Sequence, residues 1–187
     1  MLRFFKYRIR RLKTKGEYKS FAAEFKKDMG YEVPYTFLQK GKLWAVINPE
    51  GNYVGGWALV AEHPLRSIQE IPPSYPLYLD PKQVGEVTAV WLKDKCYGLP
   101  WSIMFCYTVL VSPIKYWIYS YPISETKLGN YYAAGDPLCL YKGPIVRLEG
   151  HLENPEPESV EILPPLGIVK IAIHRNFKYL KKILGLL

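Results

Sequence analysis

The turn at residues 95–102 carries the residue types best suited to bind an anion. Lys95 and Gly98 stand between a β-branched, apolar run that begins at Gly85 and a second apolar segment, Trp101 to about Val111, that is long enough for a helix. Backbone amides at a helix start lack partners within the helix and lie at the positive end of its dipole. The turn therefore suits a phosphate or pyrophosphate. An ordinary strand-to-helix connection would give the same pattern, so this signal alone has low specificity.

Other reactive side chains give weaker patterns. A helix start and Lys95 would together lower the pKa of the Cys96 thiol, although a small residue in a tight loop needs no chemical reason. Neither a nucleophile elbow around a serine nor metal or triad spacing among the three histidines is present. The three cysteines cannot all pair and form no CxxC motif, which favours a reducing compartment without structural zinc. We therefore predict a cytoplasmic protein with no metal site.

Basic residues gather at the two ends of the chain. Residues 1–27 hold ten Lys and Arg against two acidic residues, residues 28–165 hold ten against fifteen, and residues 166–187 hold five against none. This asymmetry argues against a nucleic-acid binder, which would carry basic residues and stacking aromatics interleaved on one face. It indicates instead two local basic features that could meet an anionic membrane or an acidic protein. No run reaches the roughly eighteen apolar residues of a membrane span.

The elements that must position the turn follow from periodicity and punctuation. We predict strands at residues 6–12, 43–47, 53–60, 85–92, 116–121, 138–141 and 159–163, with 145–148 as a continuation of the sixth. Helices are predicted at 17–29, ended by Gly30, at 101–111, and at 125–134, where Ser124 is the expected N-cap and Gly135 the end. Residues 63–81 contain five prolines and read as a long irregular loop.

The C-terminal segment allows more than one interpretation. Pro164 and Pro165 can open a helix from Leu166 to about Leu184, in which basic and apolar residues alternate with imperfect separation. Such a basic amphipathic helix suits an anionic bilayer or the groove of a partner protein. Packing on its own domain is an equally good interpretation, and residues 168–173 could also form a strand.

The element order resembles that of the GNAT superfamily, the acyl-CoA-dependent N-acyltransferases, over roughly residues 6–148. Residues 7–12 are similar to the opening strand of that family, Glu86 to Leu92 to its fourth strand, and Asn130 to Gly135 to its late helix end. The resemblance implies an α+β fold with a central, mostly antiparallel sheet flanked by helices. We expect a GNAT-like domain at residues 1–165 and a separate basic amphipathic segment at 166–187.

The resemblance also implies acetyl-CoA or another acyl-CoA as the second substrate. The family's phosphate loop reads Gln or Arg, two residues, Gly, one residue, then Gly or Ala. Here Lys95 takes the first place, Gly98 keeps the glycine, and Pro100 takes the last place, which removes one amide donor. The backbone of the central strand would pair with the pantetheine arm. The implied binding residues are Val90, Trp91, Leu92, Lys95, Cys96, Tyr97, Gly98, Leu99, Pro100 and Asn130.

The chemistry implied is direct attack of an amine on a thioester, which needs a base for the ammonium proton and an acid for the leaving thiolate. Glu86 stands where family members often keep a carboxylate that works through water. Tyr131 stands four residues before Gly135, at the place of the family's thiol-protonating tyrosine, with Tyr132 beside it. A solvated strand-end glutamate and tyrosines of the core are the plain alternatives.

Two functions remain open at this stage. The first is an N-acyltransferase that acts on an unidentified amine. The partial match of the phosphate loop favours this function. The second is a catalytically inactive protein of the same fold that binds or assembles partners, attached through residues 1–27 and 166–187 to a membrane surface or an acidic protein. Pro100 and the two basic ends motivate this second function.

Overall fold

A computed structural model of the chain describes residues 7–93 and 99–183. Within them, one seven-stranded sheet has the order β1-β2-β3-β4-β5-β7-β6. All neighbours pair antiparallel except β4 and β5, which are parallel. The strands are β1 (Arg8–Arg11), β2 (Gly41–Ile47), β3 (Tyr53–Val60), β4 (Val84–Leu92), β5 (Tyr116–Pro122), β6 (Leu138–Gly143) and β7 (Glu158–Leu163).

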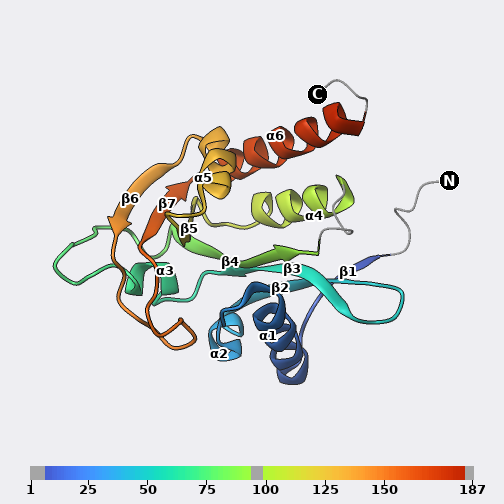
Figure 1. The fold of residues 1–187 in the computed structure, drawn as a ribbon, viewed down its shortest axis with the longest axis horizontal. Coiled ribbons are helices and arrows are strands. Elements are labelled where there is room, and N and C mark those ends of the chain that lie inside the picture. The colour runs from blue at the N-terminus through green and yellow to red at the C-terminus, as the bar shows by residue number, and fades with distance from the viewer. Residues whose placement is uncertain (1–6, 94–98, 184–187) are drawn as a thin grey trace.

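Helices cover both faces of the sheet, which confirms the predicted α+β class (Figure 1). Helices α1 and α2 lie on one side, and α4, α5 and α6 lie on the other. The helices are α1 (Lys15–Met29), α2 (Tyr35–Leu38), α3 (Arg66–Gln69), α4 (Leu99–Leu110), α5 (Thr126–Tyr132), the 3₁₀ turn η3 (Ala133–Gly135) and α6 (Pro165–Ile183).

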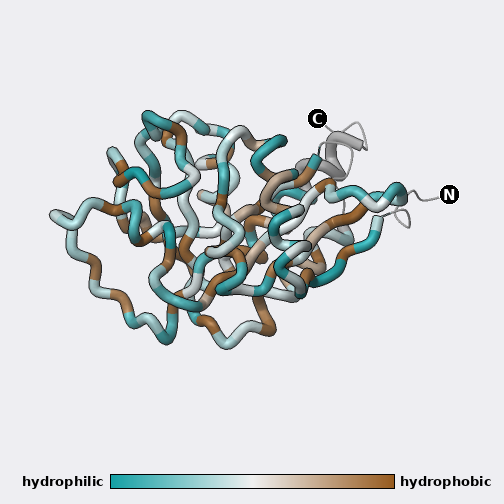
Figure 2. The backbone as a smooth tube through the Cα atoms, turned by 90° about the horizontal axis from the view of Figure 1, so that it is seen from below, coloured by the Kyte–Doolittle hydropathy of each residue, from teal (hydrophilic) through white to brown (hydrophobic). Residues whose placement is uncertain are grey.

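Each face of the sheet has its own aromatic core, because the central strands are buried on both sides. On the α1 face, the ring of Trp91 packs edge-on against Phe21, with ring centroids 6.0 Å apart. On the α4 face, Trp57 packs against Trp101 at 5.8 Å and Phe105 at 5.6 Å. Hydrophobic and hydrophilic residues alternate along the backbone (Figure 2). Among the described residues, no helix combines the length and apolarity that crossing a membrane requires.

Helix α1 ends at Gly30 as predicted but begins at Lys15, two residues before the predicted start. Thr14 accepts a hydrogen bond from the backbone of Glu17, and the Glu17 carboxylate accepts one from the Thr14 backbone, a reciprocal capping box. Gly30 closes the helix in the left-handed conformation, at φ 79°. The helix thus presents Phe21 and Phe25 to the sheet.

The parallel pair β4–β5 separates after a short stretch. Its pairing runs from Val84 with Tyr116 to Glu86 with Ile118 and ends there. Beyond that point β4 carries an extra residue relative to β3, and Ala89 takes φ 50° at this bulge. The second half of β4 is therefore paired with β3 but turned away from β5.

The structure corrects the predictions for three segments. Ser124 is not the N-cap of α5, because its hydroxyl donates to Glu156 and Glu125 occupies the cap position without a side-chain bond. Residues 145–148 are not a strand, since Val146 N donates to the carbonyl of Glu70 and Leu148 N donates to His151. The predicted loop at 63–81 contains the short helix α3.

The C-terminal segment is the helix α6, so the alternative strand at 168–173 is wrong. Gly167 allows α6 to approach η3 closely, because a Cβ there would lie 2.8 Å from the carbonyl oxygen of Gly135. The inward side chains Ile168 and Ala172 are buried.

Candidate active site

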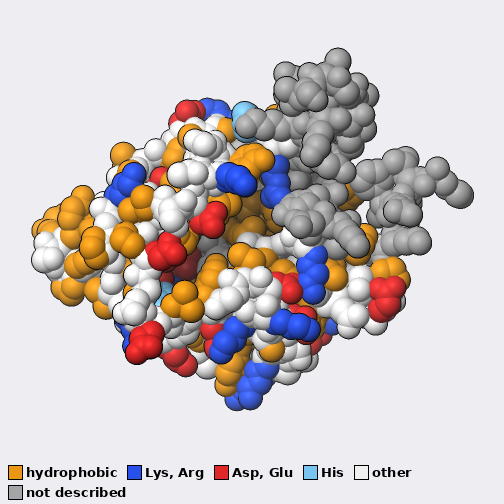
Figure 3. All heavy atoms as spheres, viewed as in Figure 1, with side chains coloured by type: hydrophobic (Ala, Val, Ile, Leu, Met, Phe, Trp, Pro, Cys, Tyr) orange, Lys and Arg blue, Asp and Glu red, His pale blue; other side chains and the backbone are white. Residues whose placement is uncertain are grey.

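The separation of β4 from β5 defines the candidate site. Among the described residues, the pairing of β4 with β5 ends at Glu86, which leaves the β5-facing backbone of the rest of β4 available to an extended ligand. Figure 3 shows that the face in view is hollowed near its centre, between the layer of α4 and α6 and the layer of α1, with acidic and basic side chains at the rim.

The predicted acyl-CoA residues lie on β4, in the first turn of α4, on α5 and in the segment outside the described residues. Val90 and Leu92 contribute to the α4-side core and Trp91 to the α1-side core. Leu99 and Pro100 lie in the first turn of α4, with Pro100 exposed. The remaining predicted loop residues, Lys95, Cys96, Tyr97 and Gly98, lie outside the described residues.

Helix α5 brings Tyr132 onto the sheet. Its ring centroid lies 4.6 Å from that of Tyr119 and 5.2 Å from that of Tyr121, both on β5. Burial raises the pKa of Tyr132, Arg175 opposes that rise, and Glu161 adds to it. Tyr132 therefore keeps its proton at neutral pH. Of the other two predicted residues of this helix, Tyr131 is half-buried and Asn130 is exposed.

Glu161 on β7 organises the tyrosines of this face. Its carboxylate accepts hydrogen bonds from Tyr119 Oη at 2.8 Å and Tyr121 Oη at 2.7 Å, and from Ser159 Oγ at 3.1 Å. Burial and the bond to Glu161 raise the pKa of both tyrosines, that of Tyr121 to about 12. Proton donors thus cluster on the α5 side of the sheet.

Glu86 lies on the opposite face and is fully buried, with 1% of its surface exposed. Its Oε2 accepts a hydrogen bond of 2.9 Å from the backbone N–H of Ser67. The pKa of Glu86 is raised to about 8, and burial is the largest cause. The hydrogen bond from the Ser67 N–H lowers this pKa, the nearby Glu70 raises it and Arg66 lowers it. The carboxyl therefore titrates close to neutral pH, as a general base should.

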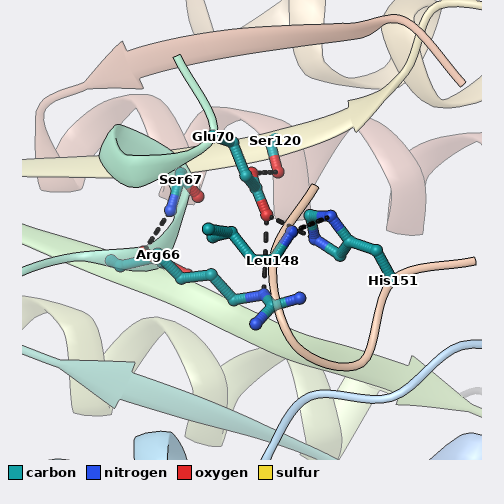
Figure 4. A network of polar contacts seen from close by, with 7 residues as sticks. Arg66, Ser67, Glu70, Ser120, Leu148 and His151 are labelled. Carbon is teal, nitrogen blue, oxygen red and sulfur yellow. Dashed lines mark hydrogen bonds and ion pairs between the residues drawn. The ribbon is translucent and has the colours of Figure 1, made fainter. Parts of the chain in front are cut away.

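Helix α3 and the loop after β6 surround Glu70 with polar groups (Figure 4). Ser120 Oγ donates to Glu70 Oε2 at 3.1 Å, and Arg66 Nε lies 3.5 Å from Glu70 Oε1. His151 Nδ1 accepts from the N–H of Leu148, which leaves Nε2 to donate to Glu70 Oε1 at 3.0 Å. We call this group, Glu70, Glu86 and Glu158 with Arg66 and His151, the acidic cluster.

Glu158, at the start of β7, completes the acidic cluster. Burial raises its pKa to about 7, Glu70 adds to the rise, and Ser120, His151 and Arg66 oppose it. Its Oε2 and the Nη2 of Arg66 are buried without a hydrogen-bond partner among the described residues. Both atoms retain hydrogen-bonding capacity for water or substrate.

Tyr31 lies between α1 and α2, where its ring packs edge-on against that of Phe25 with centroids 5.2 Å apart. Burial of its hydroxyl raises its pKa although 40% of the residue is exposed, and Tyr132, Glu158 and Glu70 raise it further while Arg66 opposes them.

Sequence reasoning missed most of the acidic cluster. Arg66 and Glu70 lie four residues apart in a proline-rich stretch, a spacing that suits an ion pair only if a helix is known to be there. Glu158 directly precedes the strand predicted at 159–163, and the three histidines show no metal or triad spacing. No local signal identifies Tyr31.

The sequence matches no protein-family model and no curated protein. Solved structures are nevertheless similar in fold. An N-acyl amino acid synthase from uncultured soil microbes, FeeM, is 12% identical with a TM-score of 0.58, over 87% of this chain and 93% of that one. A GCN5-related N-acetyltransferase from Brucella melitensis is 10% identical with a TM-score of 0.51, over 91% and 82%.

Spermidine N-acetyltransferase from Vibrio cholerae, in complex with CoA and spermine, is 9% identical with a TM-score of 0.51, over 88% of this chain and 98% of that one. Each of these proteins is matched over more than four fifths of both chains. The chain has the fold of the GNAT superfamily.

Proposed function

We propose that the chain is an N-acyltransferase that transfers an acyl group from acyl-CoA to an amine. The observation that carries this proposal is the separation of β4 from β5, with titratable carboxyls on one side and protonated tyrosines on the other. The GNAT fold supports it, because the solved proteins of similar fold are named as N-acyl or N-acetyl transferring enzymes.

In this proposal, the free edge of β4 at Val90 to Leu92 pairs with the pantetheine arm, and the turn from Lys95 into α4 holds the phosphates. Bound acyl-CoA supplies the thioester. Glu86, through water, accepts the proton of the incoming ammonium, so that the amine nitrogen can form the new bond to the carbonyl carbon. As the carbon–sulfur bond breaks, Tyr132 gives its proton to the thiolate, and the proton that the attacking nitrogen still carries in excess then restores the tyrosine. An amide and a free thiol are the products.

The burial of Glu86 favours a second function, that of a catalytically inactive binding or assembly factor. Its carboxyl is 1% exposed and already held by Ser67, as expected of a structural group in an inactive binding or assembly factor. Pro100 in the first turn of α4 agrees with this alternative, since it offers no amide to a phosphate.

Calorimetric titration with acetyl-CoA and with medium- and long-chain acyl-CoAs tests the proposal. We expect saturable heat for at least one chain length, and release of free thiol when amines are added. Free amino acids and polyamines are the first amines to test, because the solved proteins named above act on these classes or bind them. No heat at millimolar concentration for any chain length would exclude the proposal, and heat without thiol release would favour the binding factor.

We expect Tyr132→Phe to lower kcat about 100-fold, at the lower end of general acid effects because a thiolate is already a stable leaving group. Tyr131→Phe is the matched control, and we expect a much smaller loss if Tyr132, whose ring packs against those of Tyr119 and Tyr121, is the acid. Steady-state thiol release with each variant measures both values. The reverse ranking would assign the acid to Tyr131.

A further inference from the structure

Arg66 is a buried cation whose hydrogen-bonding capacity is only partly used. The residue is 8% exposed, and its Nε lies 3.5 Å from Oε1 of Glu70, towards which the side chain points (Figure 4). Its Nη2 is buried and has no hydrogen-bond partner among the described residues. A buried charged donor without an acceptor is costly, so this guanidinium is a candidate to bind an acceptor group of a ligand.

Glu158 supplies the complementary atom. Its Oε2 is an acceptor that is buried, again without a hydrogen-bond partner in the part of the chain that the structure describes. Burial raises the pKa of this carboxyl, whereas Ser120 and Arg66 lower it, so both groups lie near it. Glu158 and Ser120 are half-buried, so the acidic cluster reaches the surface at these two residues.

The two unpartnered atoms belong to a cluster at the point where β4 and β5 separate. Glu86 and Ile118 form the last pair of these strands. Ser120 follows two residues later on β5, and its hydroxyl donates to Glu70. A ligand held in this cluster would therefore lie close to Glu86, the proposed base, and to the β5-facing edge of β4.

We propose that the acidic cluster binds the acceptor amine as a free α-amino acid, with its α-carboxylate on the guanidinium of Arg66 and its α-ammonium on the carboxylate of Glu158. This inference rests on the proposed transferase function. A guanidinium pairs with a carboxylate through parallel charge-assisted hydrogen bonds, and a carboxylate accepts in the same way from an ammonium. The reaction is the one given above, with the amide formed on the α-nitrogen and the α-carboxylate unchanged.

The charge of the cluster favours a zwitterion over other amines. Its three carboxyls outnumber its one permanent cation, Arg66, so an amine that carries a phosphate dianion would meet net repulsion. A polyamine would pair with the carboxyls but would place a further cation beside Nη2 of Arg66. An amino acid supplies one group of each sign, so it satisfies both unpartnered atoms without adding net charge.

Acceptors that differ only in the carboxylate test this assignment on the full chain. The standard amino acids are assayed by thiol release, and each active one is compared with its amide and with the amine that lacks the carboxylate, as leucine with leucinamide and 3-methylbutylamine. We expect kcat/KM to be about 100-fold lower for both analogues, because Arg66 is then left unpaired. Leucinamide controls for basicity, since its ammonium loses a proton more easily than that of leucine.

Arg66→Lys tests the guanidinium itself, because this variant keeps the positive charge and loses the planar donor fork. We expect kcat/KM for the amino acid to fall about tenfold more than kcat/KM for its amide. Arg147→Lys, at an exposed arginine, is the matched control and should match the wild type. A purely structural role of Arg66 would instead lower both values equally.

Two results would overturn the inference and leave the transferase proposal in place. One is thiol release that is as fast with the analogues as with the amino acids, and the other is faster release with spermidine or phosphoethanolamine than with any amino acid. If no amine releases thiol, the transferase proposal fails on its own, and calorimetry with the amino acids decides about the site. Binding that Arg66→Lys weakens would support the site, whereas no binding, or binding that the variant leaves unchanged, would overturn it.

Discussion

Replacing Arg66 by methionine should destabilise the protein by about 3–5 kcal/mol at neutral pH, because it removes the cation from a buried group of carboxyls. Arg66 is 8% exposed, and its Nε lies 3.5 Å from Oε1 of Glu70. The positive charge of Arg66 also lowers the pKa of Glu86 and of Glu158. The free energy of urea unfolding measures this loss. Arg147→Met, at an exposed arginine, is the matched control and should change stability little.

The loss of stability in Arg66→Met should depend on pH, and the pKa values of Glu86 and Glu158 determine its direction. Glu86 and Glu158 titrate at about 8 and about 7 in the folded protein, above the ordinary 4.5, so both are protonated near pH 5 and need little compensation. As pH rises through 7 and 8 they ionise, and the missing guanidinium costs most there. An equal loss at about pH 5 and about pH 9 would mean that Arg66 stabilises by packing alone.

Much of the fold could be predicted from the sequence because its local signals agree with the tertiary structure. The strand at 53–60 follows an Asn and Gly turn and is found with the predicted bounds. The end of α1 at Gly30 is also as predicted. Where a tertiary partner competes with a local preference, prediction fails: Ser124 is a good cap residue, but Glu156 takes its hydroxyl.

Less of the candidate site could be predicted. Glu86, Tyr131 and Tyr132 were selected because they match family positions, and the structure gives two of them, Glu86 and Tyr132, a raised pKa whose largest cause is burial. The groups around them come from a four-residue helix and from a loop held by Glu70 and His151. Such short elements lack a periodic pattern and are stabilised mainly by the contacts they make.

The acidic cluster can serve both stability and catalysis, and pH separates the two roles. A buried carboxyl with a raised pKa costs stability once it ionises, yet a base must ionise to act. If the cluster were only structural, its carboxyls would be most favourable when protonated. Opposite responses of stability and activity to pH are therefore the signature of the proposed base.

We expect Glu86→Gln to lower kcat/KM about 1,000-fold if Glu86 is the base. The wild-type rate should rise with pH and level off above about 8, the folded pKa of this carboxyl, and the variant should lose that rise. Stability should respond in the opposite direction. Because the folded pKa is raised, Glu86 contributes its stability below about 4.5 and loses it as pH rises through about 8, so the variant should be the more stable protein at about pH 9.

Paired pH profiles of thiol release and of urea unfolding measure both effects of Glu86→Gln, with the exposed Glu153→Gln as a control that should match the wild type in each. A variant that keeps full activity but gains stability at high pH would show that Glu86 is a buried structural carboxyl. If the variant is slower at every pH but its rate still rises with pH, the titrating base would be Glu158. Its pKa of about 7 and its Oε2, which has no hydrogen-bond partner among the described residues, make it the next proton acceptor. Since coupled carboxyls share their titration, the double variant should flatten the profile in that case.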